Sequence, residues 1–202
     1  VQRRLFAAQV GSGGPLGMAP LLGHTEHRVA LVSDAAISPD CNQILFVSDA
    51  TGNGDIYKYD RGIDVTAVVK SPHVESSPSH APGGDAFAFI RASDSGSQLM
   101  IRNGSAPPRE VAEGFDLTRP RFASDTVIVL FGRESEEEGW KLLAHREGDT
   151  PTTLASDVRL PARAGPALSA DGQWVAWASA VSEQSSSIFL TRIDGSQTVE
   201  IS

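Results

Sequence analysis

The feature that most constrains the fold of this chain is an aromatic residue that recurs at intervals of 43, 42 and 46 residues. The recurring residues are Phe46, Phe89, Phe131 and Trp177. Each lies in a short apolar run with the composition of a β-strand. Three of the aromatics follow a proline by 11 residues, and Ala35 holds that place in the first copy; the prolines are Pro78, Pro120 and Pro166. A repeat of this length is typical of propeller blades.

The clearest copy of the repeat runs from Ile37 to Tyr59. Ser38-Pro39-Asp40 suits a tight turn, because proline fixes φ and aspartate bonds the backbone just beyond it. Ile44–Val47 is apolar and predicts a strand, and residues 48–54 are rich in turn-forming Ser, Asp, Gly and Asn. Residues 55–59 alternate polar and apolar side chains, which predicts a second strand. In each copy, a turn and a shorter apolar piece follow.

One such unit cannot bury both faces of its sheet, so the units must stack around an axis. We therefore predict an all-β chain, a β-propeller built of four-stranded blades. The sequence holds about four and a half blades in a single propeller domain over residues 1–202. Their approximate bounds are 1–23 (partial), 34–69, 77–112, 120–154 and 166–201. The innermost strands should lie at 35–38, 79–81, 121–123 and 167–169.

The partial blade at the start lacks its first two strands, and the end of the chain at Ile201 does not supply them. We therefore expect either that these residues are part of a larger propeller or that the ring closes in an unusual way. A β-sandwich with coincidental spacing is the alternative fold.

Two copies resemble the blade motif of TolB-type, WD-like propellers. The first match is Ser38-Pro39-Asp40 with Ile44–Ser48, Gly52 and Asp55-Ile56-Tyr57; the second is 169–172 with Trp174–Trp177 and Ile188-Phe189. The copies at Ala81 and Ala123 are degenerate. The resemblance implies a propeller fold but leaves the function open, because such blades occur in accessory periplasmic proteins, in lyases and in the propellers of serine peptidases.

Composition narrows the classes of partner and compartment. The net charge of −8 and the pI near 5.0 argue against nucleic acid or an anionic membrane as the main partner. Cys41 stands alone in a turn, so no intramolecular disulfide forms. No run approaches the ~20 apolar residues that span a bilayer. No signal peptide is visible, and because the first residue is Val1 this absence is uninformative.

Four histidines are the candidate metal ligands. His24 and His27 belong to the dense group His24-Thr25-Glu26-His27, His73 precedes the second blade, and His80 lies on its innermost strand. Loop and inner-strand histidines would meet near the axis, and some lyases that resemble this family hold a metal with several histidines. Surface or turn histidines are the favoured alternative, so we predict no cofactor.

The other motifs have simple structural explanations. No Gly-x-Ser-x-Gly elbow is present. Asn103-Gly104-Ser105 matches a glycosylation acceptor, but it also makes a good turn. The charge run 133–139 is typical of a solvated loop tip. Asp40, Asp125 and Asp171 recur at the same turn of their blades, where we expect them to cap the turn.

Repeat architecture without a catalytic constellation favours a non-enzymatic module that binds a protein or peptide. The alternative is a propeller enzyme, such as a metal-dependent lyase or hydrolase, or the substrate-gating domain of a peptidase. The resemblance implies a periplasmic or secreted protein, with the cytoplasm as the alternative, and the oligomeric state stays open.

Trp174 and Trp177 are three positions apart on one predicted strand. Such positions point to opposite faces of a sheet. We expect Trp177 to lie in the core between blades. We expect Trp174 to lie at the sheet edge or against whatever follows blade four, so that in an incomplete ring it is partly exposed or covered by a partner.

Overall fold

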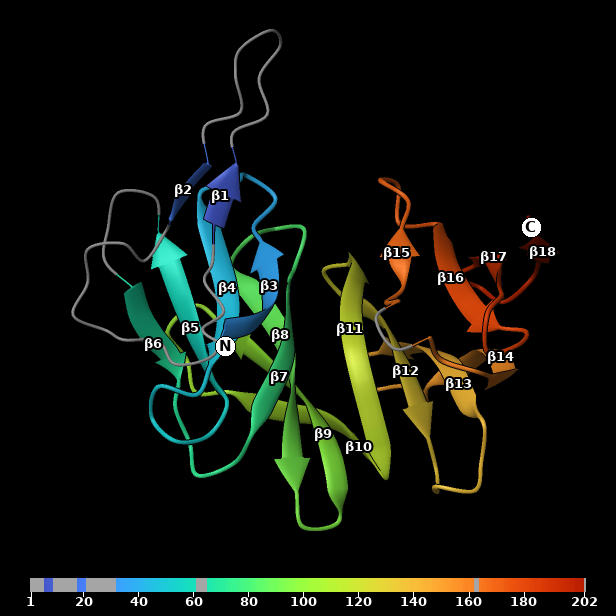
Figure 1. Ribbon diagram of the computed structural model, residues 1–202, viewed down its shortest axis with the longest axis horizontal. Coiled ribbons are helices and arrows are strands. Elements are labelled where there is room, and N and C mark those ends of the chain that lie inside the picture. Colours follow the sequence, from blue (N-terminus) through green and yellow to red (C-terminus); the bar gives the residue numbers. More distant parts are fainter. Residues whose placement is uncertain (1–5, 9–17, 21–31, 61–64, 162–163, 202) are drawn as a thin grey trace, which may run out of the picture.

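The computed structural model describes residues 6–8, 18–20, 32–60, 65–161 and 164–201. Over these residues the chain forms four antiparallel four-stranded sheets and one two-stranded sheet, and no helix. Figure 1 shows the larger sheets following one another, from the blue and teal strands on the left to the orange and red strands on the right. The predicted all-β propeller is confirmed.

Each larger sheet is one blade, and its strands pair with their neighbours in chain order. Blade one contains β3 (Val32–Ile37), β4 (Gln43–Ser48), β5 (Asp55–Asp60) and β6 (Val65–Val69). Blade two contains β7 (Glu75–His80), β8 (Ala86–Ser93), β9 (Gly96–Asn103) and β10 (Arg109–Gly114). Blade three contains β11 (Asp116–Ser124), β12 (Val127–Arg133), β13 (Trp140–Arg146) and β14 (Thr152–Val158). Blade four contains β15 (Ala167–Leu168), β16 (Trp174–Ala180), β17 (Ser186–Arg192) and β18 (Thr198–Glu200).

The two-stranded sheet lies near the start of the chain, where the sequence predicts a partial blade. It pairs β1 (Phe6–Ala8) with β2 (Met18–Pro20). The four complete blades form an arc that the described residues do not close into a ring (Figure 1).

The inner strands of the first three blades begin earlier than the sequence predicts, because each contains a β-bulge. The pairing shifts between Ser33 and Ala36 in β3, and at matching places in β7 and β11. At each bulge one non-glycine residue has a positive φ: Asp34 (49°), Ser77 (53°) and Arg119 (55°). A residue at a bulge is unpaired and bends the strand, and here the bend recurs from blade to blade.

Neighbouring blades pack through their second strands. Alternate side chains of β8 face opposite ways: Phe87 and Phe89 pack against blade one, whereas Ala88 and Ile90 pack against blade three. Both faces of the central blades are therefore shielded from solvent, and the core of this protein lies between blades.

The aromatic repeat is out of register in blade three. The inner-strand residue His80 pairs with Phe87 seven positions later, but its counterpart Phe122 pairs with Ile128 only six positions later. A shift of one residue turns a side chain to the other face. Leu130 therefore holds the place of Phe89 and faces blade two, and Phe131 faces blade four. The prediction that Phe131 is the counterpart of Phe89 is wrong, because the hairpin before β12 is one residue shorter.

The inner hairpin turns of blades one and four have the same hydrogen bonds. In blade one the Ser38 hydroxyl donates to the Asp40 carboxylate at 2.6 Å and accepts from the Gln43 amide at 2.8 Å. The Ser38 and Asn42 hydrogen bonds lower the pKa of Asp40 to about 2. In blade four, Ser169 and Asp171 make the same contacts. The predicted capping role of these two aspartates is confirmed.

Asp125 does not cap its own turn in this way. Its carboxylate accepts a hydrogen bond at 2.8 Å from the amide of Gly83, in the turn of blade two. The shortened hairpin of blade three has no room for the longer turn, and its aspartate joins two blades instead. The predicted turn-capping role of Asp125 is therefore wrong.

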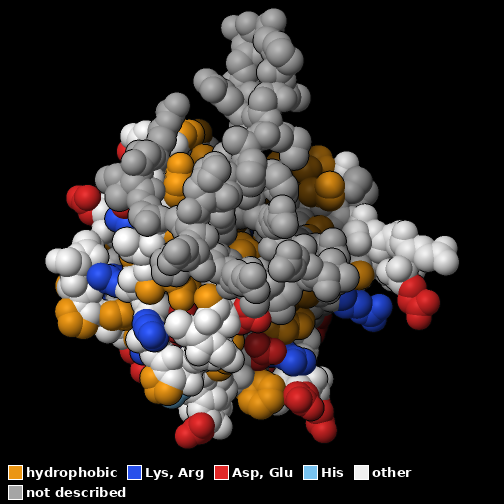
Figure 2. All heavy atoms as spheres, turned by 60° about the vertical axis from the view of Figure 1, so that its left-hand side comes forward, with side chains coloured by type: hydrophobic (Ala, Val, Ile, Leu, Met, Phe, Trp, Pro, Cys, Tyr) orange, Lys and Arg blue, Asp and Glu red, His pale blue; other side chains and the backbone are white. Residues whose placement is uncertain are grey.

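The surface carries both signs of charge. Figure 2 shows acidic and basic side chains interspersed over one face of the molecule. The acidic run after Arg133 lies in the loop between β12 and β13, as predicted, and Glu134 and Glu138 pair with Lys141 at 2.5 and 3.6 Å. None of the described residues belongs to a helix that is long and apolar enough to span a membrane.

Trp177 is buried between blades, as the sequence predicts, and Trp174 is partly exposed. Trp177 is buried in the cluster between blades three and four and stacks on Phe189 with ring centroids 4.5 Å apart. Its indole nitrogen donates to Thr191 Oγ1 at 2.9 Å. Trp174 is half-buried, and the Arg192 guanidinium lies 5.4 Å from its ring centroid.

We predict that Trp177→Ala lowers the free energy of unfolding by about 3–5 kcal/mol, because it empties an aromatic site between two blades. Trp174→Ala, the matched control on the same strand, should lower it by much less. Denaturant titration measures both values. A loss below ~1 kcal/mol for Trp177→Ala would show that the ring does not support the core.

Gly172 offers a second test of the packing between blades. Its φ is +66°, and a Cβ built on it would lie 2.1 Å from the carbonyl oxygen of Ala123 in blade three. Gly84 holds the same turn position in blade two, with φ +83°, but a Cβ there would meet nothing within 4 Å. Gly84→Ala should therefore cost only the strain of the left-handed backbone, about 1–2 kcal/mol.

We predict that Gly172→Ala lowers the free energy of unfolding by more than Gly84→Ala does, because it also separates blades three and four. The same denaturant titration compares the two variants. Equal losses would mean that the close approach of Gly172 to Ala123 adds nothing to stability.

Candidate functional site

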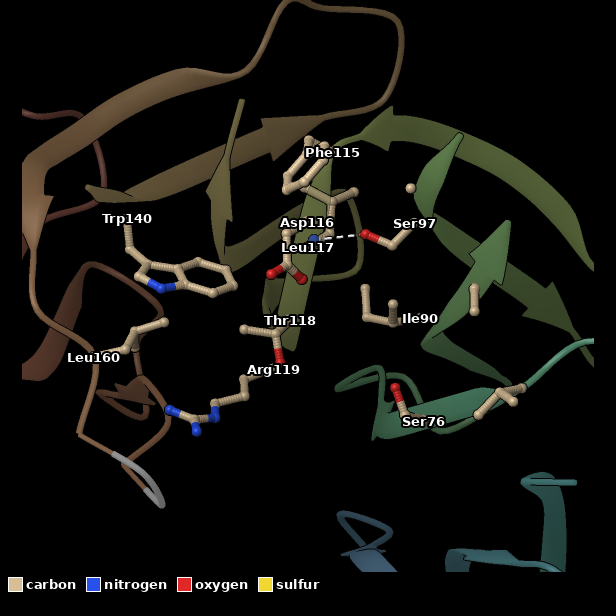
Figure 3. Close-up of a pocket in the computed structure, with 13 residues that line it drawn as sticks. Ser76, Ile90, Ser97, Phe115, Asp116, Leu117, Thr118, Arg119, Trp140 and Leu160 are labelled. Atoms are coloured by element: carbon tan, nitrogen blue, oxygen red, sulfur yellow. Dashed lines mark hydrogen bonds between the residues drawn. The ribbon is translucent and has the colours of Figure 1, made fainter. Parts of the chain in front are cut away.

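An open groove of about 560 Å³ lies between blades two and three. We call it the interblade groove. One wall comes from blade two, with Val74, Ser76 and Ile90; the other comes from Phe115–Arg119 at the start of β11, with Trp140 and Leu160. Figure 3 shows Trp140 and Leu160 together on one side of the groove, opposite Ile90 and Ser76. The groove therefore lies at the N-terminal ends of inner strands β7 and β11.

Two aromatic rings of the interblade groove are held by Arg133. Its guanidinium lies 4.8 Å from the ring centroid of Trp140 and 5.9 Å from that of Phe115. Its Nε and Nη2 atoms donate to Asp116 Oδ2 at 3.1 and 3.0 Å. Stacking on a cation that is itself ion-paired orients both rings. Phe115 nevertheless stays 42% exposed, and Val74 opposite is 51% exposed.

Hydrogen bonds between side chains and the backbone hold the rest of the interblade groove in place. The Ser97 hydroxyl accepts a hydrogen bond from the amide of Leu117 at 2.6 Å, which joins the β8–β9 hairpin to β11 (Figure 3). Arg119 donates to the carbonyl of Pro161 at 3.1 Å and to that of Ala164. These bonds hold the segment next to Leu160 against the inner strand, so the apolar wall is pre-formed.

A second cavity, of about 450 Å³, is lined by inner strands of all four blades. We call it the axial cavity. His80 and Arg121 are its basic residues, and Ala35, Ala36 and Ala167 are among its small ones. Burial lowers the pKa of His80 and of Arg121. The axial cavity uses the C-terminal parts of β7 and β11, whereas the interblade groove uses their N-terminal ends.

The structure separates two of the predicted metal ligands. His73 is exposed in the loop before β7, and His80 ends that strand. The strand between them, Glu75–His80, spans roughly 15 Å, so His73 and His80 lie at opposite ends of it. His24 and His27 lie outside the described residues. Among the residues that are described, no group of three His, Cys, Asp or Glu side chains is placed to hold a metal. The favoured interpretation, surface or turn histidines that hold no metal, stays a prediction.

Sequence reasoning missed the burial of three ionisable groups, Asp55, Glu75 and His145. Glu75 is fully buried at the start of β7, where its Oε1 accepts from Ser71 Oγ at 2.6 Å and from Arg91 Nε at 3.0 Å. The equivalent residues of the neighbouring blades are apolar, Val32 and Leu117. A charged residue at a position that is apolar in the neighbouring blades could have indicated a buried charge. The sequence does not show the bulges that align the three positions, so the comparison could not be made from it.

His145 is another of these missed groups. It is buried on β13, and neither ring nitrogen makes a hydrogen bond in the described structure. Burial lowers the pKa of its imidazole. It lies beside Asp125, Thr126 and Glu147 around a cavity of about 10 Å³, which is close to the size of one water molecule.

No family model matches the sequence, and no curated protein matches it either. Several solved structures do. TolB from Acinetobacter baumannii has a TM-score of 0.74 at 19% identity, over 91% of this chain and 45% of its own. A puromycin-hydrolyzing peptidase from Mycobacterium tuberculosis has a TM-score of 0.70 at 16% identity, over 96% and 34%. An oligogalacturonate lyase in complex with manganese has a TM-score of 0.66 at 13% identity, over 92% and 56%.

This chain thus spans between about a third and just over half of those proteins' lengths. The likeness establishes a TolB-like β-propeller fold, as the sequence predicts. Because TolB, a peptidase and a lyase share that fold, the fold leaves the function open.

The buried histidines predict a pH dependence of stability. Because folding lowers the pKa of His80 and His145, the unfolded chain binds protons first, near its ordinary pKa of about 6.5. Above that pH both imidazoles are neutral in the folded and in the unfolded chain, so their burial does not make the free energy of unfolding depend on pH. As the pH falls below about 6.5, the free energy of unfolding should decrease.

We predict that His145→Leu reduces this loss of stability, with His73→Gln, at an exposed position, as the control. Denaturant titrations at pH 7.5 and 5.5 measure the change, in a range that avoids the titration of most carboxylates. If His145→Leu lost as much stability as the unsubstituted protein between these pH values, the buried imidazole would not be a source of the pH dependence.

Proposed function

We propose that this chain is a non-enzymatic propeller module that binds a protein or peptide, and that an extended segment of the partner occupies the interblade groove. The observation that carries the proposal is the pre-formed apolar rim of that groove. Phe115 and Val74 stay largely exposed there, although Arg133 fixes the orientation of the Phe115 ring.

The side chains of the interblade groove suit a peptide. Exposed aromatic and aliphatic groups in a fixed geometry are typical anchors at interfaces. Phe115, Trp140 and Leu160 supply the apolar surface, and hydroxyl groups such as those of Ser76 and Thr118 line the same space. A partner segment would place an aromatic or aliphatic side chain between the two walls.

The resemblance of the blades to TolB-type propellers supports the same function. Such blades occur in accessory periplasmic proteins, and the solved structure of TolB shares the fold. By this analogy we propose a periplasmic or secreted location.

A propeller enzyme or a gating domain of a peptidase is the second candidate. The similarity to a puromycin-hydrolyzing peptidase and to a lyase that binds manganese favours it. Elemental analysis of the purified protein and the sequence of the full-length gene test this candidate. Stoichiometric manganese, or a hydrolase domain encoded beside the propeller, would support it over a binding module.

We predict that a random-peptide phage library selected on the purified protein yields peptides that carry an aromatic or large aliphatic residue. Phe115→Ser should weaken the binding of these peptides about tenfold or more, because it removes an anchor at the rim of the interblade groove. Val199→Ser is the control, since Val199 is apolar and as exposed as Phe115 (41% against 42%) but lies on β18, the outer strand of blade four, outside the groove.

Fluorescence anisotropy with labelled peptides measures both affinities. Peptides that bind Phe115→Ser as tightly as they bind Val199→Ser would refute the interblade groove as the binding site. Failure to select any peptide, while the purified protein turns over a substrate, would refute the binding module.

A further inference from the structure

The axial cavity contains a guanidinium group with unused hydrogen-bond donors. Arg121, on β11, donates from Nη1 to the carbonyl of Pro120 at 2.8 Å. Its Nε and Nη2 atoms make no hydrogen bond within the part of the chain that the structure describes. A Cβ built on Gly165 would lie 3.9 Å from Nη2, so the guanidinium extends from blade three toward the segment before β15.

His80 lines the same cavity from blade two. Its Nε2 atom is buried without a hydrogen-bond partner among the described residues. A buried polar group without a partner is uncommon and calls for an explanation, such as a ligand or an ordered water. Two nitrogen-bearing side chains from adjacent blades therefore line one cavity with hydrogen-bonding capacity left unused.

The charges around these two side chains are mixed. The charges of Asp34 and Arg119 affect the pKa of Arg121 in opposite directions, and those of Asp40 and Lys58 do the same for His80. Asp34 is already engaged, because its carboxylate accepts a hydrogen bond from the amide of Ser77 at 3.1 Å. Arginine keeps its positive charge even when burial lowers its pKa. The lining of the axial cavity is therefore basic, in a chain whose net charge is −8.

We propose that the axial cavity binds a carboxylate-bearing ligand through Arg121, with His80 beside it. A guanidinium presents paired N–H donors that match the two oxygens of a carboxylate. One guanidinium balances the single charge of a carboxylate, whereas a phosphate dianion would keep an uncompensated charge near Asp34. The volume of about 450 Å³ exceeds that of a lone ion, so the carboxylate is carried by a small organic acid or by the C-terminus of a peptide.

This proposal is independent of the proposed function. The axial cavity and the interblade groove use opposite ends of β7 and share no lining residue. Loss of one site should leave the other intact, so the two proposals fail separately.

Isothermal titration calorimetry with three probes tests the proposal: butyrate, which carries a single carboxylate, trialanine with a free C-terminus, and trialanine amide. We expect saturable binding of at least one of the two carboxylate probes and none of the amide. Binding of butyrate supports a small organic acid as the ligand. Binding of trialanine without butyrate supports a peptide C-terminus.

Arg121→Gln should weaken the binding about tenfold or more, because it removes both the charge and the paired donors. Arg146→Gln is the control: it removes the same charge from an exposed position at the end of β13, outside the axial cavity. Arg121→Lys keeps the charge but loses the paired N–H donors of the guanidinium, so its affinity should lie between those of Arg121→Gln and the unsubstituted protein. If Arg121→Gln does not fold, the comparison of Arg121→Lys with Arg146→Gln decides the question.

Two results would overturn the proposal. One is the absence of saturable binding by either carboxylate probe at millimolar concentrations. The other is equal affinity of the Arg121 variants and Arg146→Gln for a probe that does bind.

Discussion

The structure depends on the packing of each blade against its neighbours through the second strands. A single four-stranded sheet exposes two faces, and in this chain both faces of the central blades are apolar. Phe89 and Trp177 each project toward the preceding blade, and Leu130 does the same in blade three. Because the central blades need both neighbours to bury their side chains, stability and the geometry of the sites arise between blades.

The short hairpin of blade three shows how one residue changes that packing. With one residue fewer before β12, Phe131 turns toward blade four and adds its ring to the cluster around Trp177. The aspartate of the shortened turn bonds to Gly83 across the blade boundary. The blade thus departs from the repeat at its turn and gains contacts with both neighbours.

The bulges of the inner strands connect this packing to the candidate sites. Each bulge places one residue at a positive φ, and at two of the three bulges the side chain of that residue contacts the next blade or the segment that leads to it: Asp34 contacts Ser77, and Arg119 contacts the carbonyls of Pro161 and Ala164. The contacts of Arg119 fix the apolar wall of the interblade groove. Two positions later on β11, Arg121 enters the axial cavity. One irregular strand therefore contributes to both sites.

The sequence by itself determined the all-β repeat, the approximate blades and the turns at Ser38 and Ser169, because turn chemistry and apolar runs act over a few residues. It also indicated the buried place of Trp177. Only the tertiary structure decided which way the side chains of β12 point, and that Glu75 and His145 are buried. A strand that is covered on both faces has no polar face to reveal its register, and a turn one residue shorter reverses every side chain that follows. The interblade groove and the axial cavity were hidden for the same reason, since each is built by residues from different blades that only the stacking brings together.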